Sequence, residues 1–533
     1  MSTDKPSSGR SLPIQRTDES PDLSGADPHA GVRVFADYRG ELDLTCEILV
    51  VGSGPGGAVV AKELAEAGRD VVLVEEGPPF GKKDFTQEAG LAMQRMLREG
   101  GTRASRGNMF VPTMQANLLG GGSVINSAIC ARPPEWVWDK WAAASGVDLD
   151  AHTMAPHFER VEKFLFVAPT PTEVQGERNL RFKRGCDELG LSSEPTWRNV
   201  KGCKGSAECF TGCRNGAKKS TDTSYVPAAI RAGARVLTSI RAERVVADGR
   251  RVVAVHGHIV EPFTGKESYA VRVRPKLVVL AAGCMQTPVI LQKSEVALES
   301  GWVGKKLLMH PGLAVMAVYP DPIDPWKGAT QGYHSLHLLR EGLKLEVLWS
   351  PPAVLAARLP GLGVDYQRHL RSYDHMAPFD VIVACEKSFG SVRAKRSGFD
   401  PDIKFDFHDD DVRNIQRGVA LLSDICWASG ATSILPGIHG VPEELHSRAE
   451  SEILRTMKLK GTDTITAANH AFASTRMSKS STEGVVTTDG RCHGMDNLFI
   501  ADTGIFASSP AVNPMLTVMA LADRIAQHVA ATA

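Results

Sequence analysis

The chain has little of several features that mark other classes of protein. Aromatic residues make up only 6% of its 533 residues, and 61 Lys and Arg balance 61 Asp and Glu, so no basic excess of the kind that binds nucleic acid is present. No apolar run reaches the length of a membrane-spanning helix. Ten cysteines are too few for the disulfide framework of a small secreted domain. These absences predict no nucleic-acid partner and no membrane span.

Within the predicted N-terminal segment at 1–40, residues 1–30 have no apolar core of the kind found in a signal peptide. They are rich in Ser, Pro, Asp and other charged residues, so we expect a disordered or extended N-terminal segment. Without a targeting signal, the default expectation is a cytoplasmic protein. A length of 533 residues predicts two or more structural units.

One stretch, residues 47–77, has the order of a dinucleotide-binding βαβ unit. An apolar run at 48–51 predicts a buried parallel strand, 58–67 predicts a helix that ends at a glycine, and 70–74 predicts a second strand. Between the first strand and the helix, three glycines follow the G-x-G-x-x-G spacing: Gly52, Gly54 and Gly57. The pattern predicts a site for FAD or NAD and does not separate the two.

The physical chemistry of such a site explains each of these residues. Gly52 permits a tight turn, Gly54 lets the backbone approach a pyrophosphate, and Gly57 lets the helix pack closely on the strand. The helix N-terminus offers unpaired N–H groups to the phosphates. Glu75 closes the second strand, where an acidic side chain can bind ribose hydroxyls.

The rest of the chain shows two kinds of sequence pattern. Residues 234–282 read as strand-rich and lead into a glycine turn and a helix, which returns the chain to the dinucleotide-binding sheet. The region after residue 311 has proline breaks, short strands and an amphipathic helix at 411–428, which favours an antiparallel sheet domain. Near the end, a strand at 498–501 leads to Asp502, and a helix covers 516–529. The predicted fold class is therefore α/β, or α+β overall.

Three cysteines, Cys203, Cys209 and Cys213, occur within eleven residues in the spacing C-x5-C-x3-C. This spacing differs from the paired C-x2-C of zinc ribbons and is similar to the short cysteine runs that hold iron–sulfur clusters. Three thiolates suit a three-iron cluster, or a four-iron cluster with an outside ligand such as Cys186. Free thiols, a zinc site and a disulfide are the alternatives.

Four stretches in series resemble the glucose–methanol–choline (GMC) family of flavoprotein oxidoreductases. They are the glycine motif with Glu75, the GGGSVIN loop at 120–126, AAGCMQTPVIL at 281–291, and the block at 470–523. The resemblance implies tightly bound FAD in a Rossmann-like domain, an antiparallel-sheet substrate-binding domain, and hydride transfer from a CH–OH carbon to flavin N5. The product is an aldehyde or a ketone.

The resemblance also implies site residues. The catalytic pair falls on His470, as the base, and Asn513, which orients the alcohol oxygen. Beyond the glycine motif and Glu75, the implied cofactor-binding residues are Gly121, Gly122, Ser123, Asn126, Ala242, Asp502, Pro514 and Met515. Two departures from the family pattern, at Ala473-Ser474 and at Met477-Ser478, replace small residues by small residues. Cys284, His310 and His493 receive no catalytic role and are expected to be structural.

The implied domains are discontinuous. An FAD-binding domain would comprise 41–150, 230–310 and 465–533, and a substrate-binding domain would comprise 151–229 and 311–464. Residues 186–225 would form an insertion that carries the candidate iron–sulfur site.

The cysteine stretch is similar to two subsets of the family: FAD sugar dehydrogenases with a three-iron cluster, and long-chain alcohol oxidases, whose resemblance covers 209–244. The expected substrate is a sugar, polyol, aminoglycoside or long-chain alcohol. Electrons would pass to dioxygen or, through the cluster, to an external acceptor protein. Two other functions stay open at this point: a photodecarboxylase or lyase on the same fold, and an idle electron-transfer subunit.

Overall fold

The computed structural model describes residues 18, 20–21, 27–349, 351–464 and 466–532. Much of the predicted N-terminal segment therefore lies outside the described residues. Its described part includes strand β1 (Val32–Arg33), which pairs in parallel with β9 (Arg235–Leu237) at the edge of the first of two large sheets.

The first sheet has a parallel core. Its strand order is β1-β9-β3-β2-β12-β11-β10, and β21 pairs with the carboxyl half of β12. The pairs from β1 to β12 and the β12–β21 pair are parallel, whereas β10 and β11 extend the sheet in antiparallel fashion. This arrangement confirms the predicted Rossmann-like region. The remaining strands are β2 (Leu42–Val51), β3 (Val71–Val74), β10 (Ile240–Asp248), β11 (Arg251–Val260), β12 (Glu267–Leu280) and β21 (Leu498–Ile500).

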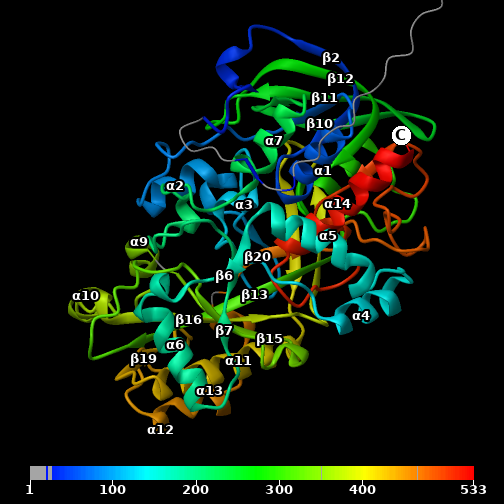
Figure 1. Ribbon diagram of the computed structural model, residues 1–533. Helices are drawn as coiled ribbons and strands as arrows, with labels where there is room; N and C mark the ends of the chain where they lie inside the picture. The colour runs from blue at the N-terminus through cyan, green and yellow to red at the C-terminus, as the bar shows by residue number, and fades with distance from the viewer. Residues whose placement is uncertain (1–17, 19, 22–26, 350, 465, 533) are drawn as a thin grey trace, which may run out of the picture.

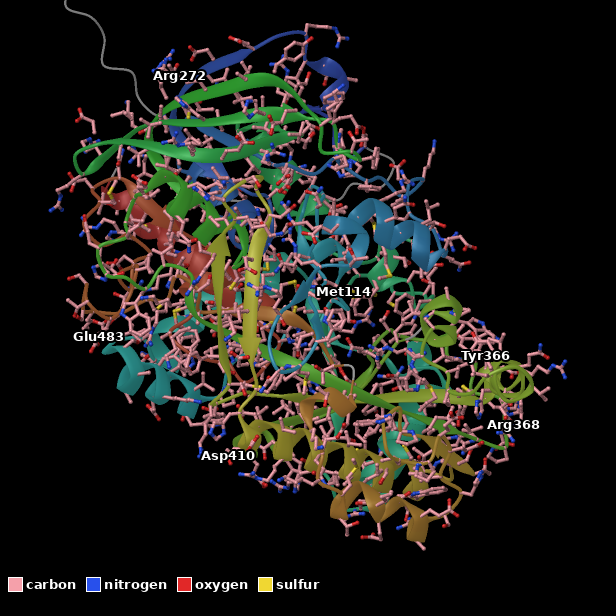
Figure 2. All side chains as sticks on the ribbon, turned by 180° about the vertical axis from the view of Figure 1, so that it is seen from behind. Met114, Arg272, Tyr366, Arg368, Asp410 and Glu483 are labelled. Carbon is pink, nitrogen blue, oxygen red and sulfur yellow. The ribbon has the colours of Figure 1, made fainter. Side chains whose placement is uncertain are left out.

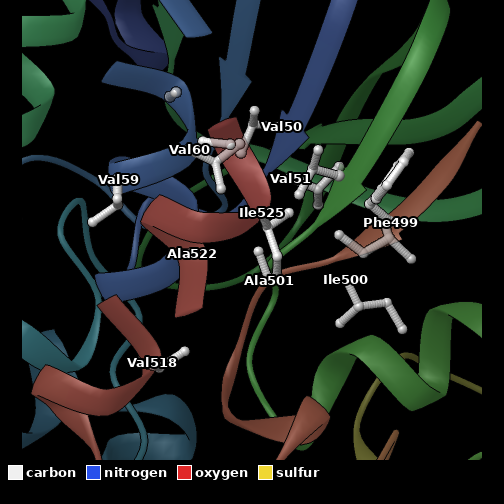
Figure 3. Packing of buried hydrophobic residues seen from close by; sticks show 14 of the residues in the cluster. Val50, Val51, Val59, Val60, Phe499, Ile500, Ala501, Val518, Ala522 and Ile525 are labelled. Atoms are coloured by element: carbon white, nitrogen blue, oxygen red, sulfur yellow. The ribbon is translucent and has the colours of Figure 1, made fainter. Parts of the chain in front are cut away.

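Two buried helices cover this sheet and meet each other (Figure 3). Helix α1 (Pro55–Glu66) follows the glycine turn, and α14 (Met515–Thr532) is the last helix of the chain. Val59 and Val60 of α1 are fully buried, as are Val518 and Ile525 of α14 to within 2%. Burying such side chains stabilises the fold by about 1.5–3 kcal/mol each. Helices α5 (Ala151–Phe164) and α7 (Tyr225–Arg231) pack beside this pair.

The second sheet is antiparallel throughout. Its order is β18-β17-β13-β16-β15-β14-β7, and β19 and β20 pair with β13. This sheet confirms the predicted antiparallel domain. Its strands are β7 (Glu194–Pro195), β13 (Lys305–Val318), β14 (Tyr333–Ser335), β15 (Leu343–Val347), β16 (Met376–Val383), β17 (Phe389–Ala394), β18 (Pro401–Asp406), β19 (Ser433–Leu435) and β20 (Ala467–Phe472).

Helix α11 (Asp409–Ala428) lies against β13 and β16 and forms the core of the second region with α6 (Glu177–Glu188). The contact with the sheet is close, because a Cβ at Gly418 would lie 2.5 Å from a methyl carbon of Val381. Figure 1 shows α11 and α6 at the end of the molecule opposite the first sheet. The two sheets therefore have separate cores.

Shorter elements surround the two sheets, and one of them connects the sheets directly. Helix α8 (Gln286–Ser294) packs against both β10 and β17 and so joins the two regions. The other short elements are α2 (Ala89–Met96), α3 (Gly122–Ile125), α4 (Glu135–Ser145), α9 (Pro352–Ala356), α10 (Val364–Arg371), α12 (Arg448–Ser451), α13 (Ile453–Thr456), β4 (Ala104–Ser105), β5 (Val111–Pro112), β6 (Val167–Pro169) and β8 (Trp197–Asn199). Among the described residues, no helix combines the length and apolar character needed to cross a bilayer.

Candidate active site

A cavity of about 680 Å³ lies between the two sheets. One side is formed by the residues that follow the carboxyl ends of the parallel strands, where open α/β sheets bind ligands. The other side is formed by β13, β15, β16 and β20 of the second sheet. Figure 2, seen from behind, places the cavity-lining Met114 between Arg272 of the first sheet and Asp410 of α11.

The glycine turn after β2 is built so that side chains would not fit. Gly52 has φ +100°, and a Cβ there would lie 2.3 Å from the carbonyl oxygen of Ala281. A Cβ at Gly57 would lie 1.9 Å from the carbonyl oxygen of Gly52, so this glycine lets α1 pack against the turn. At Gly54 a Cβ would meet nothing within 4 Å, and Gly54 lines the cavity. The turn thus presents bare backbone and the N-terminus of α1 to the cavity.

Glu75 lies directly after β3, buried at the cavity wall. One carboxylate oxygen accepts hydrogen bonds from the backbone N–H of Ser53 at 2.9 Å and from its hydroxyl at 2.6 Å, and the other accepts from the N–H of Gly77 at 2.9 Å. Burial raises the pKa of Glu75 against the effect of these bonds. The side chain is held rigidly by the turn that it faces.

The GGGS loop packs directly on the glycine turn. Gly121 has φ +53°, and a Cβ there would lie 2.8 Å from Cα of Gly54. Gly121 and Gly122 line the cavity, whereas Ser123 lies behind it, with its hydroxyl bonded to the carbonyl oxygen of Gly120 at 2.7 Å. Asn126 lines the cavity as well, and its amide nitrogen lies 2.9 Å from the sulfur of Met515.

The remaining predicted cofactor residues reach the same cavity from other elements. Asp502, after β21, accepts hydrogen bonds from the hydroxyl of Thr287 at 2.5 Å and from the N–H groups of Gly283 at 3.0 Å and Gly504 at 2.8 Å. Burial raises its pKa to about 6. Three more predicted cofactor residues line the cavity: Ala242 of β10, and Pro514 and Met515 at the start of α14. Of the predicted cofactor residues, only Gly57 and Ser123 do not line the cavity.

The two predicted catalytic residues meet in the cavity. His470 lies on β20, opposite His310 of β13, and Asn513 lies just before α14. The amide Nδ2 of Asn513 is 3.3 Å from Nε2 of His470. Burial lowers the pKa of His470 to about 4, with Glu346 opposing and Lys344 reinforcing this shift. The imidazole is therefore unprotonated at neutral pH.

Several polar residues near this pair were not predicted from the sequence. Lys344 and Glu346 of β15 are buried and ion-paired, and Gln331 donates to Glu346 at 2.6 Å. Asp380 of β16 lines the cavity, and burial followed by repulsion from Glu346 raises its pKa to about 8. One sequence signal was available: Lys344 and Glu346 alternate with apolar residues in the strand LKLEV, where charges are unusual.

Of the residues expected to be structural, two line the cavity and one does not. His310 lines the cavity, packs edge-on against His470 with 5.5 Å between ring centroids, and bonds the hydroxyl of Ser509 at 2.7 Å. Cys284 also lines the cavity, and burial raises its pKa to about 12. His493 lies outside the cavity wall and contacts the carbonyl oxygen of Ser478 at 3.0 Å.

Cys203, Cys209 and Cys213 line a second, much smaller cavity of about 10 Å³. Arg198 donates to the sulfur of Cys209 at 3.4 Å, and buried Lys218 donates to the carbonyl oxygen of Cys209 at 2.8 Å. Burial opposes a thiolate at Cys209, but these two positive charges outweigh it and lower its pKa. Burial raises the pKa of Cys213. The three side chains thus share one lined space with two cations.

As arranged, the cysteines do not fit an iron–sulfur cluster. Their cavity has room for about one water molecule. A metal site needs at least three ligand atoms close together. Among the described residues, one group of His, Cys, Asp or Glu side chains has its ligand atoms within 4.8 Å of one another, namely Glu243, His258 and Glu267. Arg241 already pairs with both of these carboxylates. The proposed outside ligand, Cys186, lies on α6 in the core of the second region.

Comparison with known proteins identifies the family. Residues 93–312 match the N-terminal model and residues 387–522 the C-terminal model of GMC oxidoreductases. Residues 50–94 match a model of an NAD(P)-binding Rossmann-like domain. The two GMC models together cover more than half of the chain and include strands of both sheets and the His470–Asn513 pair.

Relatives align along almost the whole chain. An uncharacterized GMC-type oxidoreductase of Mycobacterium tuberculosis is 28% identical over 95% of this chain and 79% of its own length. A long-chain-alcohol oxidase of Arabidopsis thaliana is 26% identical over 94% of this chain and 70% of its own length. A solved structure of a mutant formate oxidase from Aspergillus oryzae shares the fold, with a TM-score of 0.72 and 15% identity over 92% of this chain and 99% of that one. The chain belongs to the GMC oxidoreductase family and is an FAD-dependent oxidoreductase that acts on CH–OH groups.

Proposed function

We propose that His470 and Asn513 form the catalytic pair of this enzyme and that it oxidises long-chain primary alcohols with dioxygen as the acceptor. The observation that carries the proposal is the contact of 3.3 Å between the amide of Asn513 and Nε2 of His470, inside a cavity that the glycine turn also lines. When bound, FAD supplies the hydride acceptor for the CH–OH carbon. The residues of the chain supply binding, orientation and proton transfer.

The cavity fits FAD at its glycine side. The open space at Gly54 and Gly122, where a Cβ would meet nothing within 4 Å, leaves bare backbone for the diphosphate, and the N-terminus of α1 adds unpaired N–H groups. Glu75 uses three of roughly four acceptor positions, so it keeps one for a ribose hydroxyl. The GGGS loop, Asn126 and the start of α14 would enclose the remaining part of the cofactor.

The proton of the alcohol would go to His470. The imidazole is neutral at neutral pH, because burial lowers its pKa to about 4, and it lies at the cavity wall, so one ring nitrogen is free to accept a proton. A hydroxyl placed between the two side chains could donate its proton to Nε2 while its oxygen accepts from the amide of Asn513. General-base assistance of this kind contributes about 10²–10⁴-fold to a rate.

The lining of the second sheet's side favours an apolar substrate body. Most of the side chains that surround the polar pair on that side are aliphatic or aromatic, among them Leu313, Met316, Leu348, Trp349, Leu355 and Leu359. Such a wall gains free energy from burying a hydrocarbon chain. The alignment with a relative named as a long-chain-alcohol oxidase supports the same substrate class.

The name of that relative also supports dioxygen as the acceptor. Dioxygen takes up the two electrons and two protons released by the alcohol and leaves as hydrogen peroxide. The iron–sulfur route to an acceptor protein rests only on the cysteine spacing and the sequence resemblance. We leave it out of the proposal, because the cysteine arrangement described above does not fit a cluster.

A first experiment tests the base. The purified holoenzyme is mixed with an alcohol without oxygen, and loss of oxidised-flavin absorbance is followed. We expect His470→Ala to lower the rate of flavin reduction about 10²–10⁴-fold. The matched control is His493→Ala, because His493 lies outside the cavity wall. Full-rate reduction in His470→Ala would refute the assignment of the base.

A second experiment tests the substrate class. Straight-chain primary alcohols of increasing length are compared with glucose and glycerol by kcat/KM, with hydrogen peroxide measured as the product. We expect kcat/KM to rise with chain length, since each buried methylene adds about 0.8 kcal/mol of binding. A preference for glucose or glycerol, or turnover without peroxide, would contradict the proposal.

A further inference from the structure

Lys344 and Glu346 form a buried ion pair beside the catalytic pair. They stand two residues apart on β15, so their side chains lie on the same face of the strand, and they are 2% and 3% exposed. Nζ of Lys344 donates to the carboxylate of Glu346 and, at 2.5 Å, to Oδ1 of Asn513. Nε2 of Gln331 donates to the other oxygen of Glu346 at 2.6 Å.

The chemistry of these groups determines which way the Asn513 amide points. An ammonium group only donates hydrogen bonds, so the atom of Asn513 that faces Lys344 must be the amide oxygen. The NH₂ group then faces Nε2 of His470 at 3.3 Å. Because NH₂ only donates, Nε2 must accept, and the single proton of the neutral imidazole must be on Nδ1.

We propose that Lys344, held by Glu346, is a positioning residue that fixes the amide of Asn513 and thereby keeps Nε2 of His470 free of a proton. The inference rests on the proposed role of His470 as the base. If the amide turned over, its oxygen would face Nε2 and favour the tautomer with a proton there, which cannot accept the proton of an alcohol. Lys344 would thus act through Asn513 and need not touch the substrate.

Stability alone does not account for the pair. Desolvating a lysine and a glutamate costs free energy, and an apolar pair of similar volume is often as stable or more so. Here the pair also lies at the site, because Glu346 and Asn513 both line the cavity. A buried pair with a positioning role predicts that its removal changes the chemistry of His470 more than the folding of the chain.

Other titratable groups also surround His470. His310 of β13 packs edge-on against it, and Asp380 of β16 lines the same cavity. Lys344 lowers the pKa of His470 and Glu346 raises it. Removing one member of the ion pair must therefore shift this pKa in a direction that depends on which member is removed.

The test uses the holoenzyme labelled with ¹⁵N-histidine, with the His470 signals identified by their loss in His470→Ala. In the wild type we expect the tautomer with the proton on Nδ1. In Lys344→Met/Glu346→Leu, which leaves no unpaired charge, we expect that tautomer to lose its dominance. Flavin reduction by a straight-chain alcohol, followed over a range of concentrations, should slow about 10–100-fold at saturation with little change in KM.

The single variants sharpen the test. Lys344→Met should raise the pKa of His470 and Glu346→Gln should lower it, both read from the same ¹⁵N signals, because the two charges act on the imidazole in opposite directions. These shifts test whether the pair faces His470, and the tautomer tests whether Lys344 positions the amide of Asn513. The matched control is Lys62→Met/Glu63→Leu/Glu66→Leu, which removes another buried set of ion-paired side chains outside the cavity wall, including both glutamates that pair with Lys62. We expect that control to leave the His470 tautomer unchanged.

The outcomes separate this inference from the proposed function. A wild-type tautomer with the proton on Nε2, or a Lys344→Met/Glu346→Leu variant that keeps both the wild-type tautomer and rate, would overturn the positioning role. Full-rate flavin reduction in His470→Ala would overturn the base itself, whatever the tautomer. The ¹⁵N measurement needs no substrate, so it gives a result even where an alcohol is not oxidised.

Discussion

The two sides of the cavity are built from different materials. The glycine side is mostly backbone, and its acids, Glu75 and Asp502, accept hydrogen bonds from N–H and hydroxyl groups of neighbouring segments. The side formed by the second sheet carries buried titratable side chains at Lys344, Glu346 and Asp380. Cofactor binding at the backbone side should therefore respond to added side-chain atoms, whereas the properties of the other side should respond to changes in protonation.

After the loss of the His470 base, the largest expected effect comes from adding one methyl group to the backbone side. In Gly121→Ala the new Cβ would lie 2.8 Å from Cα of Gly54, at a backbone conformation of φ +53° and ψ −144° that is essentially restricted to glycine. Strain of about 1–3 kcal/mol should move the loop away from the turn. We expect FAD affinity to fall roughly 5–150-fold, measured by titrating apoprotein with FAD.

The control for this prediction is Gly90→Ala in α2. There a Cβ meets nothing within 4 Å and φ is not in the left-handed region, so we expect unchanged FAD binding. Equal FAD affinity in Gly121→Ala and the wild type would show that the close packing of the two glycine segments does not shape the cofactor site.

The same contrast explains how much of the fold was predictable. The strand–turn–helix–strand of the glycine side is contiguous, so the predicted 48–51, 58–67 and 70–74 correspond to β2, α1 and β3 within a few residues at most boundaries. β20 was not predicted, because its sequence AANHAF is short and poor in β-branched residues. Its strand state depends on pairing with β13, far away in the sequence.

The site was predictable to a similar degree. Gly52 and Gly54 follow from local spacing, whereas His470 and Asn513 came only from the family resemblance. Neither local spacing nor the family resemblance assigns a role to Lys344, because its bond to Asn513 joins positions 169 residues apart. The cysteine spacing is equally local, but spacing does not determine where thiols point, and Arg198 enters that site from outside the motif.

A smaller effect is expected on the charged side, from Asp380→Asn. The pKa of Asp380 is about 8 in the folded protein and near 4 when unfolded, so between these values the folded state holds the extra proton and loses stability as the pH rises. Asn carries no such cost. We expect the variant to have a higher Tm than the wild type at pH 8. The difference in Tm between variant and wild type should be at least about 2 °C larger at pH 8 than at pH 5.

Asp402→Asn provides the opposite case on the surface. Arg106 pairs with Asp402 and lowers its pKa, so the stability that this carboxylate contributes is already complete above pH 5 and is lost only in more acidic solution. The melting difference for this variant should therefore be small and the same at pH 5 and pH 8. A pH-independent difference for Asp380→Asn as well would mean that Asp380 is ionised at both pH values.

The smallest effect is expected at the cysteine cavity, which has cations like the charged side but room for only about one water molecule. Protein purified without oxygen should show flavin absorption bands alone, with little bound iron, and Cys209→Ser should leave both the spectrum and the rate of flavin reduction unchanged. A broad brown shoulder that disappears in Cys209→Ser would instead mean that the three cysteines rearrange to bind a cluster. In that case the cysteine segment would be a third functional region, and an external electron acceptor would replace dioxygen in the proposed reaction.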